Sequence, residues 1–127
     1  MAVSKWGRCP WSYEFEKEKI YPEDLEKFKP ISGPFAVFEC IGTCGEYIII
    51  KSGDNTFRVK PEIFRELTEP KYKIGDTVKI KDMYATILFI EWHNEKTEHY
   101  YYITVNGKRK SRRYFESELS FYSVVSC

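Results

Sequence analysis

The chain has 127 residues, a formal net charge of +1 and 17% aromatic residues. This length suits one domain or two very small ones, and the aromatic content argues against a disordered chain. No apolar run approaches the ~20 residues of a membrane span, and the near-neutral charge excludes a global electrostatic attraction to nucleic acid.

The N-terminal residues and the cysteines indicate a compartment. The first eleven residues, MAVSKWGRCPW, are too polar for a secretory signal, which predicts a cytoplasmic protein. In a reducing cytosol we expect the cysteines to stay free thiols rather than form two disulfides. They are Cys9, Cys40, Cys44 and Cys127.

The chain begins with an aromatic-rich arm. Residues 1–19 are expected to be irregular, with Trp6 and Trp11 tucked against the body of the protein. Residues 21–28 are the clearest helical segment, because Pro22 suits the first helical position and acidic residues follow it in the first turn.

The rest of the first half alternates strands and turns. Strands are expected at 35–41, 47–51 and 56–60, with turns at 42–45 and 52–55 between them. The strand 47–51 is apolar on both sides and is therefore expected to be central. Residues 61–67 are expected to form a short helical turn, and 68–71 a linker.

The second half also alternates strands and turns. Strands are predicted at 77–81, 85–92, 100–105, 110–114 and 121–125. A polar hairpin loop at 93–97 and the Asn106-Gly107 turn connect three of them. Residues 115–119 are expected to form one helical turn before the last strand.

The two halves contain an internal echo. Each has a strand led by aromatic residues, a glycine turn, a basic strand and a short turn with glutamate and an apolar anchor. The aligned pairs are Gly53 with Gly107, Val59 with Tyr114 and Phe64 with Leu119. A true repeat predicts two similar small sheets, in units 1–69 and 70–127; the shared sequence preferences of β-strands are the alternative explanation.

A family resemblance covers residues 70–125. Its motifs are Gly75-Asp76-Thr77-Val78, the apolar strand 85–92, Tyr-Tyr-Ile-Thr-Val-Asn-Gly at 101–107 and the Tyr-x-x-x-Glu-Leu pattern at 114–119. This half resembles an SH3-like small β-barrel of the Tudor or KOW type. The chain as a whole also resembles small bacterial proteins of uncharacterised function. The resemblance implies a mainly β fold of two SH3-like barrel halves in tandem with a short N-terminal helix.

Five cations follow the Asn-Gly turn within six residues, next to a run of three tyrosines. A simple two-residue turn would pair Tyr101 with Arg112 and Tyr100 with Arg113, which places cations on the core face, so we expect a one-residue bulge. Arginine–tyrosine stacking across the strands would stabilise the hairpin. The predicted contact surface comprises Trp92, Tyr100, Tyr102, Lys108, Arg109, Lys110, Arg112 and Arg113.

Metal and catalytic chemistry have weak signals. Cys40 and Cys44 lack the paired C-x₂-C spacing of zinc sites, and His93 and His99 are expected to be exposed in a hairpin, with Trp92 opposite His99. No cysteine or serine lies in a nucleophile motif. No metal, cofactor or catalytic residue is therefore predicted.

Three function classes follow, in order of preference. The first is a non-enzymatic cytoplasmic binding protein, a protein–protein interaction module whose partner the sequence does not identify. The second is a nucleic-acid-binding accessory protein that uses the basic hairpin 106–114. The third is an enzyme of unknown type.

Overall fold

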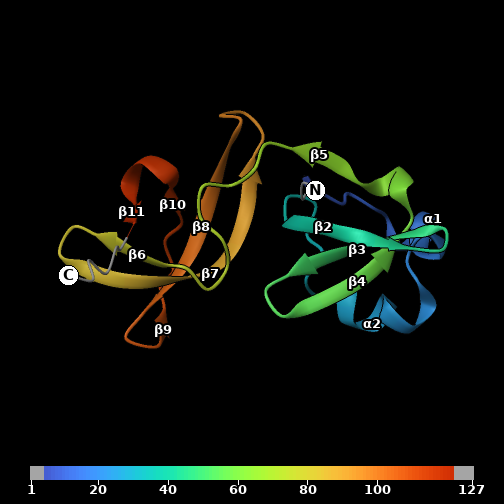
Figure 1. The fold of residues 1–127 in the computed structure, drawn as a ribbon, viewed down its shortest axis with the longest axis horizontal. Coiled ribbons are helices and arrows are strands. Elements are labelled where there is room, and N and C mark those ends of the chain that lie inside the picture. The colour runs from blue at the N-terminus through green and yellow to red at the C-terminus, as the bar shows by residue number, and fades with distance from the viewer. Residues whose placement is uncertain (1–4, 122–127) are drawn as a thin grey trace. The chain divides into compact units, whose positions relative to one another are not determined.

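The computed structural model describes residues 5–121 and shows a mainly β chain with two antiparallel sheets and a few short helices. The chain forms two compact units, Met1–Glu69 and Pro70–Cys127, and each contains one sheet (Figure 1). Within the described residues no helix is long and apolar enough to cross a membrane.

The first sheet has the strand order β4-β3-β2-β1-β5. Its strands are β1 (Lys5–Arg8), β2 (Val37–Cys44), β3 (Tyr47–Ser52), β4 (Asn55–Val59) and β5 (Arg65–Leu67). The central position predicted for the strand at 47–51 is confirmed, because β3 pairs on both sides. The first strand of the meander is longer than expected, since β2 continues through the predicted turn at 42–45.

The N-terminal arm was expected to be irregular, but it supplies an interior strand. β1 pairs with β2 on one side and β5 on the other, and Trp6 is buried. Gly7 permits this close packing: a Cβ there would lie 2.5 Å from the Arg65 carbonyl oxygen and 2.6 Å from the Phe64 ring. The indole of Trp11 donates a 2.7 Å hydrogen bond to Ser32.

Between β1 and β2 the chain makes a long helical excursion. It contains α1 (Tyr13–Glu16), the 3₁₀ helices η1 (Lys17–Lys19) and η2 (Pro22–Asp24), and α2 (Leu25–Phe28). The helix predicted at 21–28 is confirmed as η2 followed by α2, with Pro22 at its start. Phe28 is fully buried and anchors this excursion on the sheet.

The same excursion covers the edge strand β4. Ile20 forms a bridge with Val59, and Tyr21 N donates a 2.9 Å hydrogen bond to the Arg58 carbonyl. The Asp24 carboxylate accepts bonds from the Arg58 amide (2.8 Å), Nε (3.0 Å) and Nη2 (3.1 Å). The Arg58 guanidinium carbon lies 3.6 Å from the Tyr21 ring centroid. This cover blocks β4 from pairing with another strand.

The Asp24–Arg58 contact predicts a pH-dependent stability. Partial burial raises the pKa of Asp24, but the hydrogen bonds from the Arg58 side chain and amide have a larger, opposite effect. The pKa therefore lies below its ordinary value of 3.8. The charged form therefore stabilises the fold above the unfolded-state pKa, and this contribution is lost as pH falls through the folded-state pKa.

We expect Asp24→Asn to lower the urea midpoint of unfolding at pH 7. The difference in midpoint between this variant and wild type should become smaller at about pH 3. Glu26→Gln, an exposed neighbour in the same excursion, is the control and should change the midpoint little at either pH. A gap for Asp24→Asn that stays constant with pH would contradict this account.

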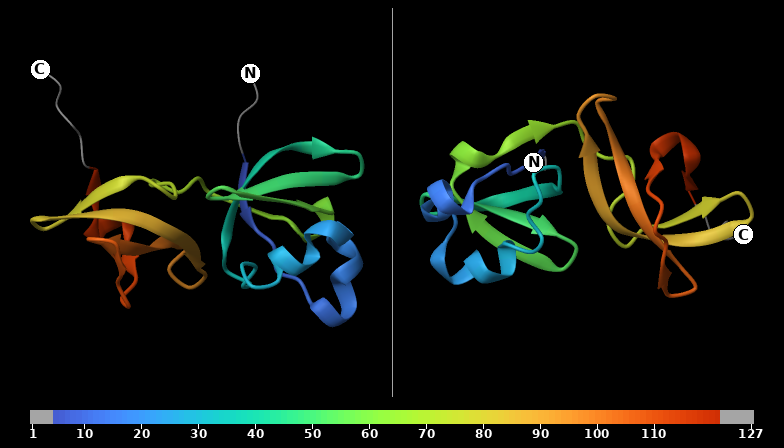
Figure 2. Two further views of the ribbon diagram at one scale, coloured as in Figure 1. Left: turned by 90° about the horizontal axis from the view of Figure 1, so that it is seen from below. Right: turned by 180° about the vertical axis from the view of Figure 1, so that it is seen from behind.

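The second sheet has the order β10-β8-β7-β6-β11, with β9 also paired to β8 (Figure 2). Its strands are β6 (Thr77–Ile80), β7 (Met83–His93), β8 (Glu98–Val105), β9 (Lys108–Arg109), β10 (Tyr114–Phe115) and β11 (Ser120–Phe121). The helical turn predicted at 115–119 is confirmed as the 3₁₀ helix η4 (Glu116–Glu118). Most of the strand predicted at 121–125 lies outside the described residues.

Neither sheet closes into a barrel over residues 5–121, in contrast to the expected barrel halves. The edge strands are β4 and β5 in the first unit and β10 and β11 in the second. β5, β10 and β11 have only two or three described residues each, too few to continue the pairing around a closed circuit.

Both units nevertheless end in the same way. In each, the last strand follows a 3₁₀ helix, η3 (Pro61–Ile63) or η4, and pairs antiparallel with the first strand. Residues 61–67 were expected to form one helical turn. Instead η3 ends at Ile63 and β5 follows it. The isolated proline turn was visible in the sequence, whereas the pairing of β5 depends on the distant β1.

Candidate functional site

The β7–β8 hairpin sets the two faces of the second sheet. The register passes from Ile87–Ile103 to Phe89–Tyr102, which leaves Leu88 as the extra residue of a β-bulge. Because side chains alternate between faces, successive residues beyond this bulge lie on the inner and the outer face of the sheet in turn. Tyr101 is fully buried on the inner face, whereas its neighbours Tyr100 and Tyr102 lie on the outer face, where Tyr100 is still only 7% exposed and Tyr102 is half-buried.

Side chains from four strands and a loop gather on this outer side, which we call the arginine–tyrosine face. Its members are Phe89, Glu91 and His93 of β7, Tyr100 and Tyr102 of β8, Arg109 of β9, Arg113 of the following loop, and Phe115 of β10. The face thus mixes aromatic rings, two guanidinium groups and one carboxylate.

The basic segment reaches this arrangement through an irregular register. Arg109 pairs with Thr104, and continuing that register would place Arg112 opposite Tyr101. Instead Tyr114 pairs with Tyr101, so the register shifts by two residues rather than by the expected one-residue bulge. An even shift preserves the alternation of faces and brings an aromatic ring, not a cation, into the core.

Each arginine of the segment lies against a tyrosine ring. Measured from guanidinium carbon to ring centroid, the pairs are Arg109 on Tyr102 (4.9 Å), Arg113 on Tyr100 (4.5 Å) and Arg112 on Tyr114 (4.4 Å). Arg113 Nη1 also donates a 2.8 Å hydrogen bond to the Tyr100 hydroxyl. These contacts hold flexible side chains in defined positions while Arg113 remains 52% exposed.

Arg112 differs from the other two arginines. It lies over Tyr114, whose side chain shares the inner face with Tyr101. It also forms an ion pair with Glu118. Its charge is therefore neutralised locally, and it is not part of the arginine–tyrosine face.

Glu91 lies at the centre of the face. Its carboxylate accepts a 3.1 Å hydrogen bond from the Tyr102 hydroxyl and lies 4.0 Å from Arg113 Nη1. Burial, followed by the nearby Glu91 charge, raises the pKa of both Tyr100 and Tyr102. Both phenols therefore remain neutral hydrogen-bond donors at physiological pH.

The two ends of the face differ in charge. At one end His93, Tyr100 and Phe115 contact one another edge to face, and Lys96 lies 4.5 Å from the Phe115 ring centroid. An acidic residue also lies at this end, since Glu98 is opposite His93 in the strand register.

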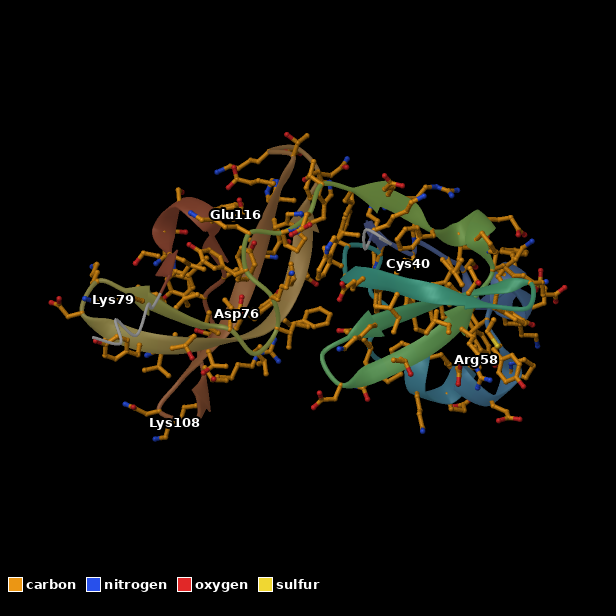
Figure 3. All side chains as sticks on the ribbon, viewed as in Figure 1. Cys40, Arg58, Asp76, Lys79, Lys108 and Glu116 are labelled. Carbon is orange, nitrogen blue, oxygen red and sulfur yellow. The ribbon has the colours of Figure 1, made fainter. Side chains whose placement is uncertain are left out.

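At the other end Lys108 and Lys110 flank Arg109 on the exposed hairpin tip; Figure 3 labels Lys108 there. Among the described residues, none of these three cations forms an ion pair. The second unit carries ten cationic and seven acidic side chains, a formal charge of +3, whereas the first carries ten and twelve, a formal −2. The near-neutral total therefore conceals a locally positive tip.

A family model matches residues 1–120. The chain belongs to the family of unknown function DUF6960. No curated protein and no solved structure matches the chain. The function of this DUF6960 protein therefore has to be argued from its own residues.

Not every predicted surface residue of the DUF6960 chain lies on the face. Tyr100, Tyr102, Arg109 and Arg113 come together, Lys108 and Lys110 border them, and Arg112 turns away. Trp92 is only 8% exposed, on the inner side of the sheet.

The expectation that His99 is exposed is wrong, because the predicted Trp92–His99 pairing is present but faces inward and leaves His99 2% exposed. Sequence reasoning missed Phe89, Glu91, His93 and Phe115 as members of the face. The signal was the i, i+2 spacing of the three β7 residues, which only the bulge at Leu88 sets on the outer side.

Outside the face, the described residues include one buried thiol, Cys9. Burial, followed by the negative charge that Cys40 would carry, raises the pKa of Cys9 to about 12, so this thiol is a poor nucleophile. Across residues 5–121 no three histidine, cysteine or carboxylate side chains gather as a metal site.

Proposed function

We propose that this DUF6960 member is a non-enzymatic binding protein whose arginine–tyrosine face contacts another polypeptide. The observation that carries the proposal is the stacking of exposed Arg109 and Arg113 on Tyr102 and Tyr100. Arginine and tyrosine are enriched among the residues that dominate protein interfaces. Side chains already held in place lose less conformational entropy on binding, which favours affinity.

The proposal includes two SH3-like units in tandem, in a cytoplasmic protein. The shared closing arrangement of a 3₁₀ helix and a last strand paired with the first supports the repeat, and so does the predicted alignment of Val59 with Tyr114. Each of these residues lies in the strand before a 3₁₀ helix and pairs with the central strand of its meander. A cytoplasmic location agrees with the free thiols of Cys9, Cys40 and Cys44.

Nucleic-acid binding through the hairpin is the second candidate. The exposed cations Lys108, Arg109 and Lys110 favour it, because they have no carboxylate partner among the residues the structure describes. Phosphate groups are recognised by such clusters.

Affinity capture with chemical cross-linking in the source cells tests the proposal. We expect wild type to recover a discrete protein that Arg109→Glu/Arg113→Glu no longer recovers. The control is Lys27→Glu/Lys51→Glu, which makes the same charge change at exposed positions of the first unit. Recovery that is indifferent to the arginine variant would refute the proposal, and nuclease-sensitive recovery would support the second candidate.

A further inference from the structure

We infer that the polypeptide bound by the arginine–tyrosine face is an acidic segment whose aspartate or glutamate carboxylates are held by Arg109 and Arg113. This inference rests on the proposed function and specifies the chemistry of the partner. Lys108 and Lys110 flank the same end of the face and add positive charge to it.

The distribution of charge on the face is the first argument. Arg109, Lys108 and Lys110 have no acidic partner among the described residues. Within residues 5–121 the acidic partner of Arg113 is Glu91, at 4.0 Å. By contrast, Glu118 pairs with Arg112. Positive charge is thus left uncompensated at one end of the face, and a carboxylate-bearing segment is its electrostatic complement.

The geometry of the arginines is the second argument. A guanidinium group carries five N–H donors in a planar fork that matches a carboxylate with two parallel hydrogen bonds. The tyrosine ring covers one side of each guanidinium group, and Arg113 remains 52% exposed, so N–H donors stay open to a ligand. For Arg113 the hydrogen bond to the Tyr100 hydroxyl fixes the orientation further and uses one nitrogen, Nη1.

The same stacking argues against single-stranded nucleic acid. Proteins that bind such strands without sequence preference stack bases on open aromatic faces. Here guanidinium groups cover the Tyr100 and Tyr102 rings, so a base would first have to displace Arg113 or Arg109.

Fluorescence anisotropy with three labelled probes of similar length tests the inference. The probes are a peptide of alternating Glu and Thr, its Gln counterpart and an oligothymidine. We expect the Glu peptide to bind at least about tenfold more tightly than either other probe, and its affinity to fall with added salt. Arg109→Lys/Arg113→Lys keeps the charge but removes the fork, and should weaken binding of the Glu peptide about tenfold.

Arg112→Lys is the matched control, because it makes the same substitution within the same segment but off the face; we expect less than about a twofold change. Urea unfolding checks that all variants are folded. Tighter binding of the oligothymidine, or equal affinities of the lysine double variant and wild type for the Glu peptide, would overturn the inference.

The two proposals fail separately. If the captured protein depends on Arg109 and Arg113 but the Glu peptide does not bind, the acidic ligand is wrong and the binding face stands. If capture of a protein is indifferent to both arginines, the proposed function itself is wrong.

Discussion

Replacing Phe28 by alanine is expected to destabilise the first unit by about 3–5 kcal/mol. The Phe28 ring is fully buried and meets three others, with centroid distances of 5.1 Å to Phe57 and 5.6 Å to both Phe38 and Trp11. Alanine would leave a cavity between the helical excursion and the sheet, and rigid aromatic neighbours cannot collapse to fill it.

Urea denaturation followed by circular dichroism measures this loss, and Phe15→Ala is its control. Phe15 is a phenylalanine of the same excursion, but it is 74% exposed, so its truncation should change the unfolding free energy by no more than about 0.5 kcal/mol. Equal effects of the two substitutions would show that Phe28 does not anchor the excursion.

The parts of the fold that were predictable depend on local signals. Pro22 followed by acidic residues marks a helix start, and the Asn106-Gly107 turn marks a hairpin, whatever the rest of the chain does. β1 and β5 have no such signal. They are four and three residues long, and Gly7 matters only because Phe64 packs where its side chain would be.

The candidate site was predictable in composition but not in register. The cations beside the tyrosines are plain in the sequence, and arginine–tyrosine stacking across the strands was expected and is present, although the partners depend on the register. The sequence does not show that Arg112 forms an ion pair with Glu118 instead of pairing with β8. The same residues are compatible with a two-residue shift and with a one-residue bulge. Burial decided between them, since only the even shift places Tyr114 opposite Tyr101.

That buried pairing leads to the second large effect. Tyr101→Phe is expected to destabilise the second unit by about 2 kcal/mol, because it removes a fully buried tyrosine's hydroxyl from a partly buried hydrogen-bond network. The hydroxyl donates a 2.7 Å bond to the Glu116 carboxylate and accepts a 3.4 Å bond from Tyr72 N. Glu116 also accepts a 3.0 Å bond from Lys71 N, so this network ties the start of the unit to η4.

Tyr102→Phe is the control for this network. Tyr102 is the next residue in the same strand, but its hydroxyl donates a hydrogen bond to Glu91 on the outer side. Its expected cost is within about 0.5 kcal/mol, since water can replace a partner at a partly exposed site. Burial, followed by the Glu116 bond, raises the pKa of Tyr101, so its phenol remains a donor throughout the neutral range. Urea midpoints at pH 7 compare the two variants. If Tyr102→Phe cost as much as Tyr101→Phe, the division of the strand into a structural inner face and an outer face with little structural role would be wrong.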